Sequence, residues 1–115
     1  MAHYQELIVW QKSMDFVELI YQETECFPNS ERFGLVAQMR RSAISIPSNI
    51  AEGSRRSGRK EYRNFLLIAY GSGAEIETQL LLSDRLGFLS SKKKMLFATL
   101  EEIMKMLNVL QQKLQ

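Results

Sequence analysis

Apolar residues recur at intervals of three or four along almost the whole chain, and this spacing constrains the fold more than any other feature. Such intervals place the residues on one face of an α-helix, which has about 3.6 residues per turn. In the second helical segment the stripe is Leu35, Met39, Ala43, Ile46, Ile50 and Gly53, and in the third it is Tyr62, Leu66, Ala69, Gly73, Ile76 and Leu80. The last segment has the most regular stripe: Leu96, Leu100, Ile103, Leu107, Leu110 and Leu114. No segment alternates apolar and polar residues as a half-buried strand does. The spacing predicts an all-α protein with helices over about residues 4–24, 31–56, 59–86 and 91–114.

Short breaks separate these four helices. Pro28 disfavours helical geometry in the residue before it, and Gly58 lies in the turn "RSGR". Gly87 follows the third helix, in the position that glycine usually takes at a helix C-terminus. Helices of similar length with short connections predict an up-down-up-down antiparallel four-helix bundle. We expect residues 1–115 to form this bundle as a single domain.

Three of the four helices carry more apolar surface than one shared core needs. In the first helix the main stripe is predicted to be Leu7, Trp10, Met14, Val17 and Tyr21, with Val9, Phe16 and Ile20 beside it. The third helix is apolar nearly all round at residues 65–70, and the fourth adds Met95, Met104, Met106 and Val109. Such residues either widen the core contact or lie singly on the surface, or they cover a neighbouring subunit. Because three helices are affected, we favour a homo-oligomer.

Pro47 interrupts the second helix within the stretch "SIPSN". It lacks the N–H that would bond to the preceding turn, which costs roughly 3 kcal/mol in a straight helix, so we expect a kink there. Ser45, Ser48 and Asn49 are placed to satisfy the backbone groups that a kink would free. Asn49 and Glu52 are expected to face the third helix and to join a polar network at that end.

The residues needed for common catalytic sites are missing. His3 is the only histidine and lies near the N-terminus, so no Ser/His/Asp or Cys/His arrangement can be assembled. Cys26, the only cysteine, is expected to be packed in the turn beside Phe27. Structural zinc needs about four Cys or His ligands, and no phosphate-binding glycine motif occurs, since "GSG" at 71–73 lies within a helical pattern. We therefore predict no enzyme, no catalytic residue, no metal site and no cofactor, and we assign "GSG" to close helix packing.

Several features favour a cytoplasmic protein that does not contact a membrane. The longest apolar run, "FLLIAY" at 65–70, is far shorter than the roughly 20 residues that span a bilayer. The first residues, "MAHYQELIVWQK", have neither the basic nor the apolar region of a signal peptide. A single cysteine fits a reducing compartment.

Positive charge is concentrated between Arg40 and Arg63. This segment has seven basic and two acidic residues, a net charge of +5, whereas the whole chain carries +2. If the second and third helices are antiparallel about a turn near residue 57, Arg40 and Arg41 lie level with Glu75 and Glu77. The planar guanidinium fork suits carboxylates, so we predict that these four residues pair across the two helices in a structural role.

The remaining basic residues of the segment crowd the predicted turn, and we call them the basic cluster: Arg55, Arg56, Arg59, Lys60 and Arg63. Five cations so close together repel one another unless an anion or salt screens them, which is typical of a surface that binds phosphates. The alternative is a solvated helix end on which Glu52 pairs with Arg55 or Arg56. Both interpretations remain open at this point. With Tyr62 as the only nearby aromatic residue, any contact is expected to be mainly to phosphates.

A second group of cations, "KKK" at 92–94, is predicted to lie at the opposite end of the bundle. Lysines at a helix N-terminus oppose the helix dipole, so Lys92, Lys93 and Lys94 do not help the fold locally. They serve either solubility or a contact, and the sequence does not separate the two.

Specific motifs over most of the chain resemble a known family. The motifs are "LIVWQKSMDFV" (7–17), "IPSNIAEG" (46–53) and "EYRNFLLIAYGSGAEIETQL" (61–80). They are similar to the four-helix-bundle family first noticed as open reading frames within intervening sequences of bacterial large-subunit ribosomal RNA. The positions that match are Arg40, Arg41, Pro47, Asn49, Glu52, Glu75 and Glu77. Lysines at 92–94 depart from the more acidic residues expected there.

The resemblance implies a small cytoplasmic bacterial protein that assembles as a ring-shaped homopentamer. The family is also similar to accessory proteins of diversity-generating retroelements, which associate with a reverse transcriptase and nucleic acid. Two functions follow as expectations. The first is a non-enzymatic oligomer, a pentamer as the resemblance implies, that binds structured RNA or DNA through the basic cluster. The second is a scaffold for a polymerase-type protein, with the extra apolar faces as docking surfaces.

Overall fold

Four long helices make up most of the computed structural model, which describes residues 3–115. They are α1 (Ile8–Thr24), α2 (Leu35–Arg55), α3 (Arg59–Arg85) and α4 (Lys93–Gln112). Two single 3₁₀ turns, η1 (Tyr4–Glu6) and η2 (Asn29–Glu31), precede α1 and α2, and the described residues include no strand. The four predicted helices are therefore present.

Two of the helices start later than the spacing suggested. The first begins at Ile8, because Leu7 has an extended backbone (φ −72°, ψ 127°) that separates η1 from α1. The second begins at Leu35, because Gly34 leaves helical geometry (φ −106°, ψ −102°) after η2. In both places the apolar spacing continues through residues that are not part of the α-helix.

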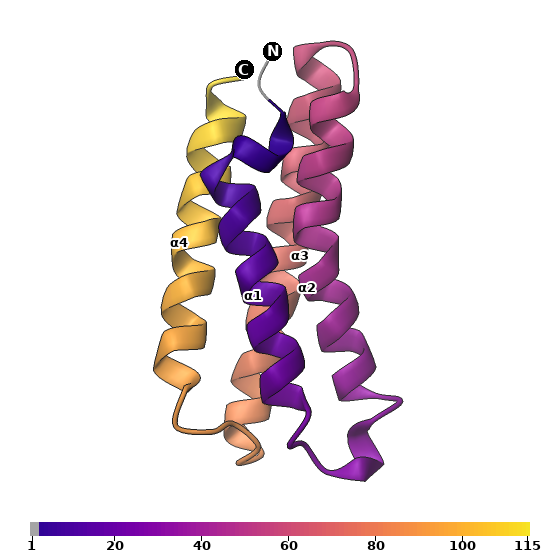
Figure 1. The fold of residues 1–115 in the computed structure, drawn as a ribbon, viewed down its shortest axis with the longest axis vertical. Helices are drawn as coiled ribbons and strands as arrows, with labels where there is room; N and C mark the ends of the chain where they lie inside the picture. Colours follow the sequence, from indigo (N-terminus) through magenta and orange to yellow (C-terminus); the bar gives the residue numbers. More distant parts are fainter. Residues whose placement is uncertain (1–2) are drawn as a thin grey trace.

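The helices form an antiparallel bundle in which each contacts two others (Figure 1). The helix α1 packs on α2 and α4, and α3 packs on the same two, while the diagonal pairs do not contact within residues 3–115. The 27 residues of α3 give a length of about 40 Å at 1.5 Å per residue, close to the 44 Å long axis of the molecule. The α2–α3 turn, η1 and the end of α4 lie at the same end of the bundle (Figure 1).

The core runs along the middle of the bundle and follows the predicted stripes of α2, α3 and α4. Fully buried large side chains include Met39 and Ile46 of α2, Leu66 and Ile76 of α3, and Leu100, Ile103 and Leu107 of α4. Burial of such a side chain contributes about 1.5–3 kcal/mol. The stripe of α1 was predicted wrongly, because Phe16 and Ile20 are completely buried. Met14 and Tyr21 of the predicted stripe are about 40% exposed.

The error in α1 has a simple geometric origin. Two adjacent apolar stripes on α1 both have helical spacing, so spacing does not choose between them. Packing between α2 and α4 selects the stripe that contains Val9, Phe16 and Ile20. Trp10 and Val17 of the other stripe are half-buried at its edge.

Small residues bring α3 close to its two neighbours. A Cβ atom on Gly53 would lie 2.7 Å from the Cβ of Phe65 and 3.3 Å from the carbonyl oxygen of Tyr62. Farther along the same pair of helices, the hydroxyls of Ser45 and Ser72 are hydrogen-bonded at 2.7 Å. On the other side, a Cβ atom on Gly73 would collide with the sulfur of Met104 in α4. The assignment of "GSG" to close packing is thus confirmed at Gly73.

The helix α2 is unbroken across Pro47, which is buried inside it. Asn49 donates from Nδ2 to the carbonyl oxygen of Ser45 at 2.8 Å and to its hydroxyl at 2.9 Å. Asn49 therefore makes a local backbone contact beside the proline, and the repair of groups freed by a kink stays a prediction. The kink itself stays a prediction.

None of the helices within residues 3–115 combines the length and the apolar character that a membrane span requires.

Candidate functional site

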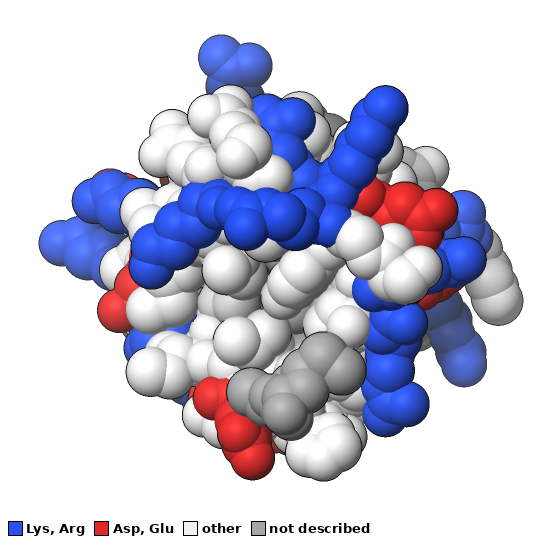
Figure 2. All heavy atoms as spheres, turned by 90° about the horizontal axis from the view of Figure 1, so that it is seen from above, with Lys and Arg blue, Asp and Glu red and all other residues white. Residues whose placement is uncertain are grey.

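The basic cluster occupies the end of the bundle where the α2–α3 turn lies beside η1 and the end of α4. Gly58 makes the turn with a positive φ of 99°, which glycine adopts without the steric cost of a Cβ atom. Arg55 ends α2, Arg59 begins α3, and Arg63 lies one turn into α3. Seen from above, basic side chains extend across this end of the molecule (Figure 2).

One member of the cluster is paired with a carboxylate. Arg56 forms an ion pair with Glu52 one turn earlier, at 2.8 Å from Nη2 to Oε2. This hydrogen bond raises the pKa of the Arg56 guanidinium above its ordinary value. The guanidinium also lies 5.2 Å from the centroid of the Phe65 ring. This pairing of Glu52 is the one expected from the alternative interpretation of the cluster as a solvated helix end.

Other members of the cluster are held by neutral groups of distant segments. Arg59 donates from Nη2 to the carbonyl oxygen of Lys113 at 2.6 Å, just beyond the end of α4. Arg63 donates from Nε to Oε1 of Gln111 at 3.1 Å. Arg55 lies 5.4 Å from the centroid of the Tyr4 ring. A cation beside the carbonyl groups at a helix C-terminus is favourable, so these contacts support the bundle.

The contacts fix the cations without neutralising them. A carbonyl group, an amide side chain and an aromatic ring carry no net charge, unlike the carboxylate of Glu52. Within residues 3–115 no carboxylate forms an ion pair with Arg55, Arg59, Lys60 or Arg63. Four of the five positive charges therefore remain available to an external anion.

An apolar pocket of about 450 Å³ opens among these cations. Its walls include the rings of Tyr4 and Tyr62 and the side chains of Leu110 and Leu114, with Arg56 and Arg59 also lining it. Burial raises the pKa of the Tyr62 hydroxyl. The sequence pointed to Tyr62 alone, but the antiparallel topology returns the N-terminal segment to this end. Tyr4 is therefore a second aromatic residue at the site.

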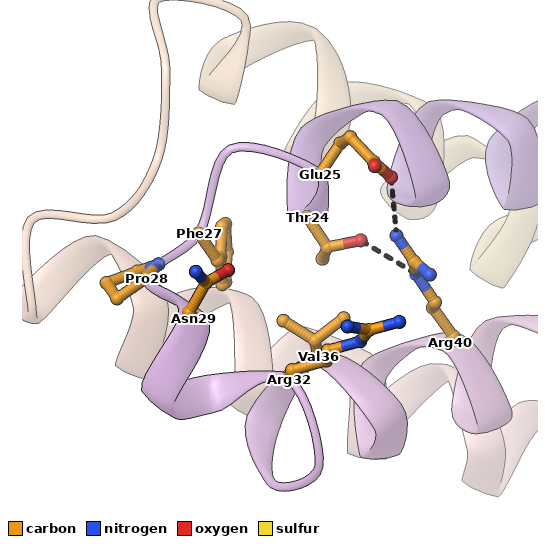
Figure 3. A pocket seen from close by; sticks show the side chains of 8 residues that line it. All are labelled: Thr24, Glu25, Phe27, Pro28, Asn29, Arg32, Val36 and Arg40. Carbon is orange, nitrogen blue, oxygen red and sulfur yellow. Dashed lines mark hydrogen bonds and ion pairs between the residues drawn. The ribbon is translucent and has the colours of Figure 1, made fainter.

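Within residues 3–115 Arg40 forms no ion pair or side-chain hydrogen bond with α3, so its predicted pairing with Glu75 and Glu77 is wrong. It reaches α1 instead, where Nη2 lies 3.2 Å from Oε2 of Glu25 and Nε donates to the hydroxyl of Thr24 at 3.0 Å (Figure 3). The guanidinium also stacks on the Tyr21 ring, 4.3 Å from its centroid. These contacts tie the end of α1 to α2, so the role of Arg40 is structural, as predicted, but its partners are different.

Helix geometry explains the change of partner. Arg40 follows the core residue Met39 in α2 and lies on the side of the helix that faces α1. The side that faces α3 carries Ser45, whose hydroxyl bonds to Ser72. Arg41, Glu75 and Glu77 are all exposed, and none forms an ion pair within the described part of the chain. The predicted polar network is thus reduced to two local contacts, Asn49 with Ser45 and Glu52 with Arg56.

Arg40 also lines a polar pocket of about 240 Å³ between the α1–α2 loop and α2 (Figure 3). Thr24, Asn29 and Arg32 line the same pocket. The Arg40 guanidinium is already engaged by Glu25 and Thr24, so its charge is largely compensated. In this compensation of charge the pocket differs from the basic cluster. Its residues belong to α1, α2 and the connection between them.

The opposite end of the bundle is held by a carboxylate that the sequence did not single out. Glu23 is only 7% exposed and accepts hydrogen bonds from the backbone N–H of Ser90 at 2.6 Å and from its hydroxyl at 2.7 Å. Among the nearby lysines, Lys93 pairs with Asp84 at 3.0 Å, while Lys92 and Lys94 are exposed. Glu23 lies in the polar stretch "YQET" at the end of α1, and only the three-dimensional arrangement brings it to the α3–α4 loop.

The described residues contain no group of three histidine, cysteine, aspartate or glutamate side chains placed to hold a metal ion. His3 is exposed, ahead of η1. Cys26 is exposed as well, so the expectation that it is packed is wrong. The neighbouring Phe27 takes the buried position and lies against Phe88.

A family model for the 23S rRNA-intervening sequence protein matches residues 5–109. The chain belongs to this family. The match confirms the family expected from the sequence motifs and extends into α4, which those motifs did not cover. A search of curated proteins found none that matches.

A solved structure supports the same assignment to the 23S rRNA-intervening sequence protein family. It is the 1.70 Å crystal structure of a protein with unknown function from the S23 ribosomal protein family of Bacteroides thetaiotaomicron VPI-5482. The two chains are 27% identical, with a TM-score of 0.83 over 91% of this chain and 96% of the other. Family and fold are therefore the same from both comparisons.

Proposed function

We propose that this family member is a non-enzymatic, cytoplasmic homo-oligomer that binds RNA or DNA phosphates through the basic cluster. One observation carries the proposal: four of the five cations are held by neutral partners or stand free, and so keep their charge. A purely structural helix end would gain more from carboxylate partners than from repulsion between unscreened cations.

The arrangement suits a phosphate backbone. Bonds to Lys113 and Gln111 hold Arg59 and Arg63 in place before any ligand arrives, which lowers the entropy lost on binding. The guanidinium groups are forks that match phosphate oxygens, and binding releases counterions from the nucleic acid. Affinity should therefore fall steeply as salt is added.

We propose further that the oligomer is a pentamer, as the family resemblance implies. Several apolar side chains of α3 are well exposed in the single chain: Ile68 at 52%, Leu81 at 53% and Leu82 at 46%. A neighbouring subunit would cover such a surface. In a ring, copies of the basic cluster would surround one axis, and their summed potential would exceed that of one chain.

The decisive experiment is binding of a fluorescent structured RNA, measured by anisotropy over a range of salt concentrations. The double variant Arg55→Glu/Arg59→Glu should weaken binding by at least about tenfold, because it reverses two contacts to phosphate. The matched control is Lys92→Glu/Lys94→Glu, which makes the same charge change at the opposite end and should leave affinity within about twofold. Equal affinity for the cluster variant and the wild type would overturn the proposal.

A second candidate function rests on the exposed apolar side chains. The same α3 residues could dock a polymerase-type protein, so that the bundle is an accessory subunit with no direct contact to nucleic acid. A co-purifying polymerase that resists nuclease and high salt would support this function. Loss of the partner under nuclease would support the nucleic-acid function instead.

A further inference from the structure

We propose that the apolar pocket of the basic end accepts an unpaired nucleobase, so that the ligand is a single-stranded segment of nucleic acid. The inference rests on the proposed function and adds to it the conformation of the ligand. Phosphate binding alone would not distinguish a duplex from a single strand, whereas a base pocket would.

The first support is the chemistry of the pocket walls. Tyr4 and Tyr62 supply aromatic rings, and Leu110 and Leu114 supply aliphatic surface, in a space of about 450 Å³. This volume lies within the range of pockets that bind small planar molecules. Proteins that bind single strands combine such aromatic surfaces with a positively charged path for the backbone.

The second support is the position of the charges around the pocket. Arg59 lines it, and Arg55 lies 5.4 Å from the centroid of the Tyr4 ring in its wall, on the other side of the turn at Gly58. A nucleobase is flat and uncharged, and it is attached to a chain with a phosphate on each side. A base inside the pocket would place its two flanking phosphates near these guanidinium groups. An isolated apolar side chain in the pocket would leave the guanidinium groups without a partner.

The third support is that the pocket is built by segments from three parts of the chain. Tyr4 belongs to η1, Tyr62 to α3 and Leu114 to the residues after α4. The bond from Arg59 to Lys113 joins two of these segments directly beside the pocket. The pocket is thus held open by the fold and lies where an unstacked base would meet the basic cluster.

The test compares four fluorescent probes of about twelve nucleotides at one salt concentration, a length within the site sizes of single-strand-binding domains. They are a single-stranded RNA, a single-stranded DNA, a duplex, and a strand with abasic residues in place of its central nucleotides. The abasic strand keeps the phosphates and loses the bases. We expect the intact single strands to bind about tenfold more tightly than the abasic strand and the duplex. The affinities for the single-stranded RNA and the single-stranded DNA show which sugar is preferred.

Two pocket variants and one control refine the test. Tyr62→Ala should reduce the preference for the intact strand to within about threefold, because it removes one stacking surface. Since Tyr62 also packs on Gly53, Leu114→Trp is a second variant, beyond the end of α4, that narrows the pocket and leaves α3 intact. Tyr70→Ala is the matched control, because Tyr70 is an exposed tyrosine of the same helix away from the pocket.

The outcomes separate the inference from the proposed function. Equal binding of all four probes that is lost in Arg55→Glu/Arg59→Glu would overturn the base pocket and support phosphate binding. A preference for intact strands that survives both pocket variants would overturn the inference, since another surface then reads the base. Absence of binding to every probe, with the protein folded, would overturn the proposed function as well.

Discussion

Arg59 and Lys113 join the α2–α3 turn to the end of α4 through a hydrogen bond of 2.6 Å, although 54 residues separate them in the chain. The bond links the stability of the bundle end to the position of a cation in the basic cluster. Substitutions at this end can therefore separate support of the fold from binding of an anion.

Arg59→Ala should lower the free energy of unfolding by about 0.5–1.5 kcal/mol, because the carbonyl group of Lys113 loses its donor. Lys60→Ala is the control: it removes a neighbouring charge of α3 that forms no ion pair within residues 3–115, so stability should stay within about 0.5 kcal/mol. Urea denaturation measures both. Equal stability of the two variants would show that the Arg59 bond contributes nothing.

Gly53→Ala should destabilise the protein by about 1–3 kcal/mol although alanine is the better helix former, because its Cβ would meet Phe65 at 2.7 Å. Gly71→Ala is a matched substitution in α3, where a Cβ has no neighbour within 4 Å. It should stabilise the helix by about 0.5–1 kcal/mol. Thermal unfolding of both variants checks the prediction, and a destabilised Gly71→Ala beside an unaffected Gly53→Ala would contradict it.

Glu23→Ala should cost about 1–3 kcal/mol, because it removes the carboxylate that accepts hydrogen bonds from the N–H and the hydroxyl of Ser90. Ser90→Ala keeps the N–H bond to Glu23 and removes the exposed hydroxyl, with its bonds to Glu23 and from the N–H of Lys92, so its cost should be smaller. In a double-mutant cycle from denaturant unfolding, the two substitutions should couple, since they act on one contact. Additive costs would mean that the loop is held by other groups.

Arg40→Ala should destabilise the protein by about 1–2 kcal/mol through the loss of its bonds to Thr24 and Glu25. Arg41→Ala is the natural comparison, because Arg41 is exposed and has no ion pair in the described range. Its stability should match the wild type within about 0.5 kcal/mol. If denaturant unfolding showed that Arg41→Ala is less stable than Arg40→Ala, the original expectation that Arg41 pairs across the helices would be restored.

The raised pKa of Tyr62 makes a prediction about alkaline stability. The folded protein holds the Tyr62 proton more tightly than the unfolded chain, whose tyrosines titrate near the ordinary pKa of about 10. The stability from the buried neutral hydroxyl is complete below pH 10 and is lost as the pH rises through the folded pKa. The midpoint of urea unfolding, followed from pH 8 to 11, should fall less in Tyr62→Phe than in the wild type.

The four-helix bundle could be predicted from the sequence because apolar residues recur with helical spacing. In α2, α3 and α4 one stripe has regular helical spacing, and most of its residues are buried, among them Met39, Leu66 and Leu107, although α3 and α4 carry further apolar residues outside it. On α1 two faces compete, and only contacts with α2 and α4 decide between them. The starts of α1 and α2 were predicted less accurately. Non-helical backbone at Leu7 and Gly34 sets these starts, and the spacing of apolar residues does not reveal it.

The positive charge of the candidate site could be predicted from the sequence, but the contacts of its side chains could not. The cluster from Arg55 to Arg63 follows from composition and from the position of the turn. The partners of Arg59 and Arg63 lie about fifty residues away, and Tyr4 arrives from the other end of the chain. The pairing of Arg40 failed because level position along two helices does not specify the direction of a side chain around its own helix.

The long separation of Arg59 and Arg63 from their partners has a consequence for synthesis on the ribosome. When Arg59 and Arg63 emerge from the ribosome, Gln111 and Lys113 have not yet emerged, and these arginines have nothing to hold them. The charged surface takes its final shape only after α4 has docked. A chain truncated before α4 would carry the same cations on loose side chains, so that ordered recognition becomes available only to a completely translated bundle.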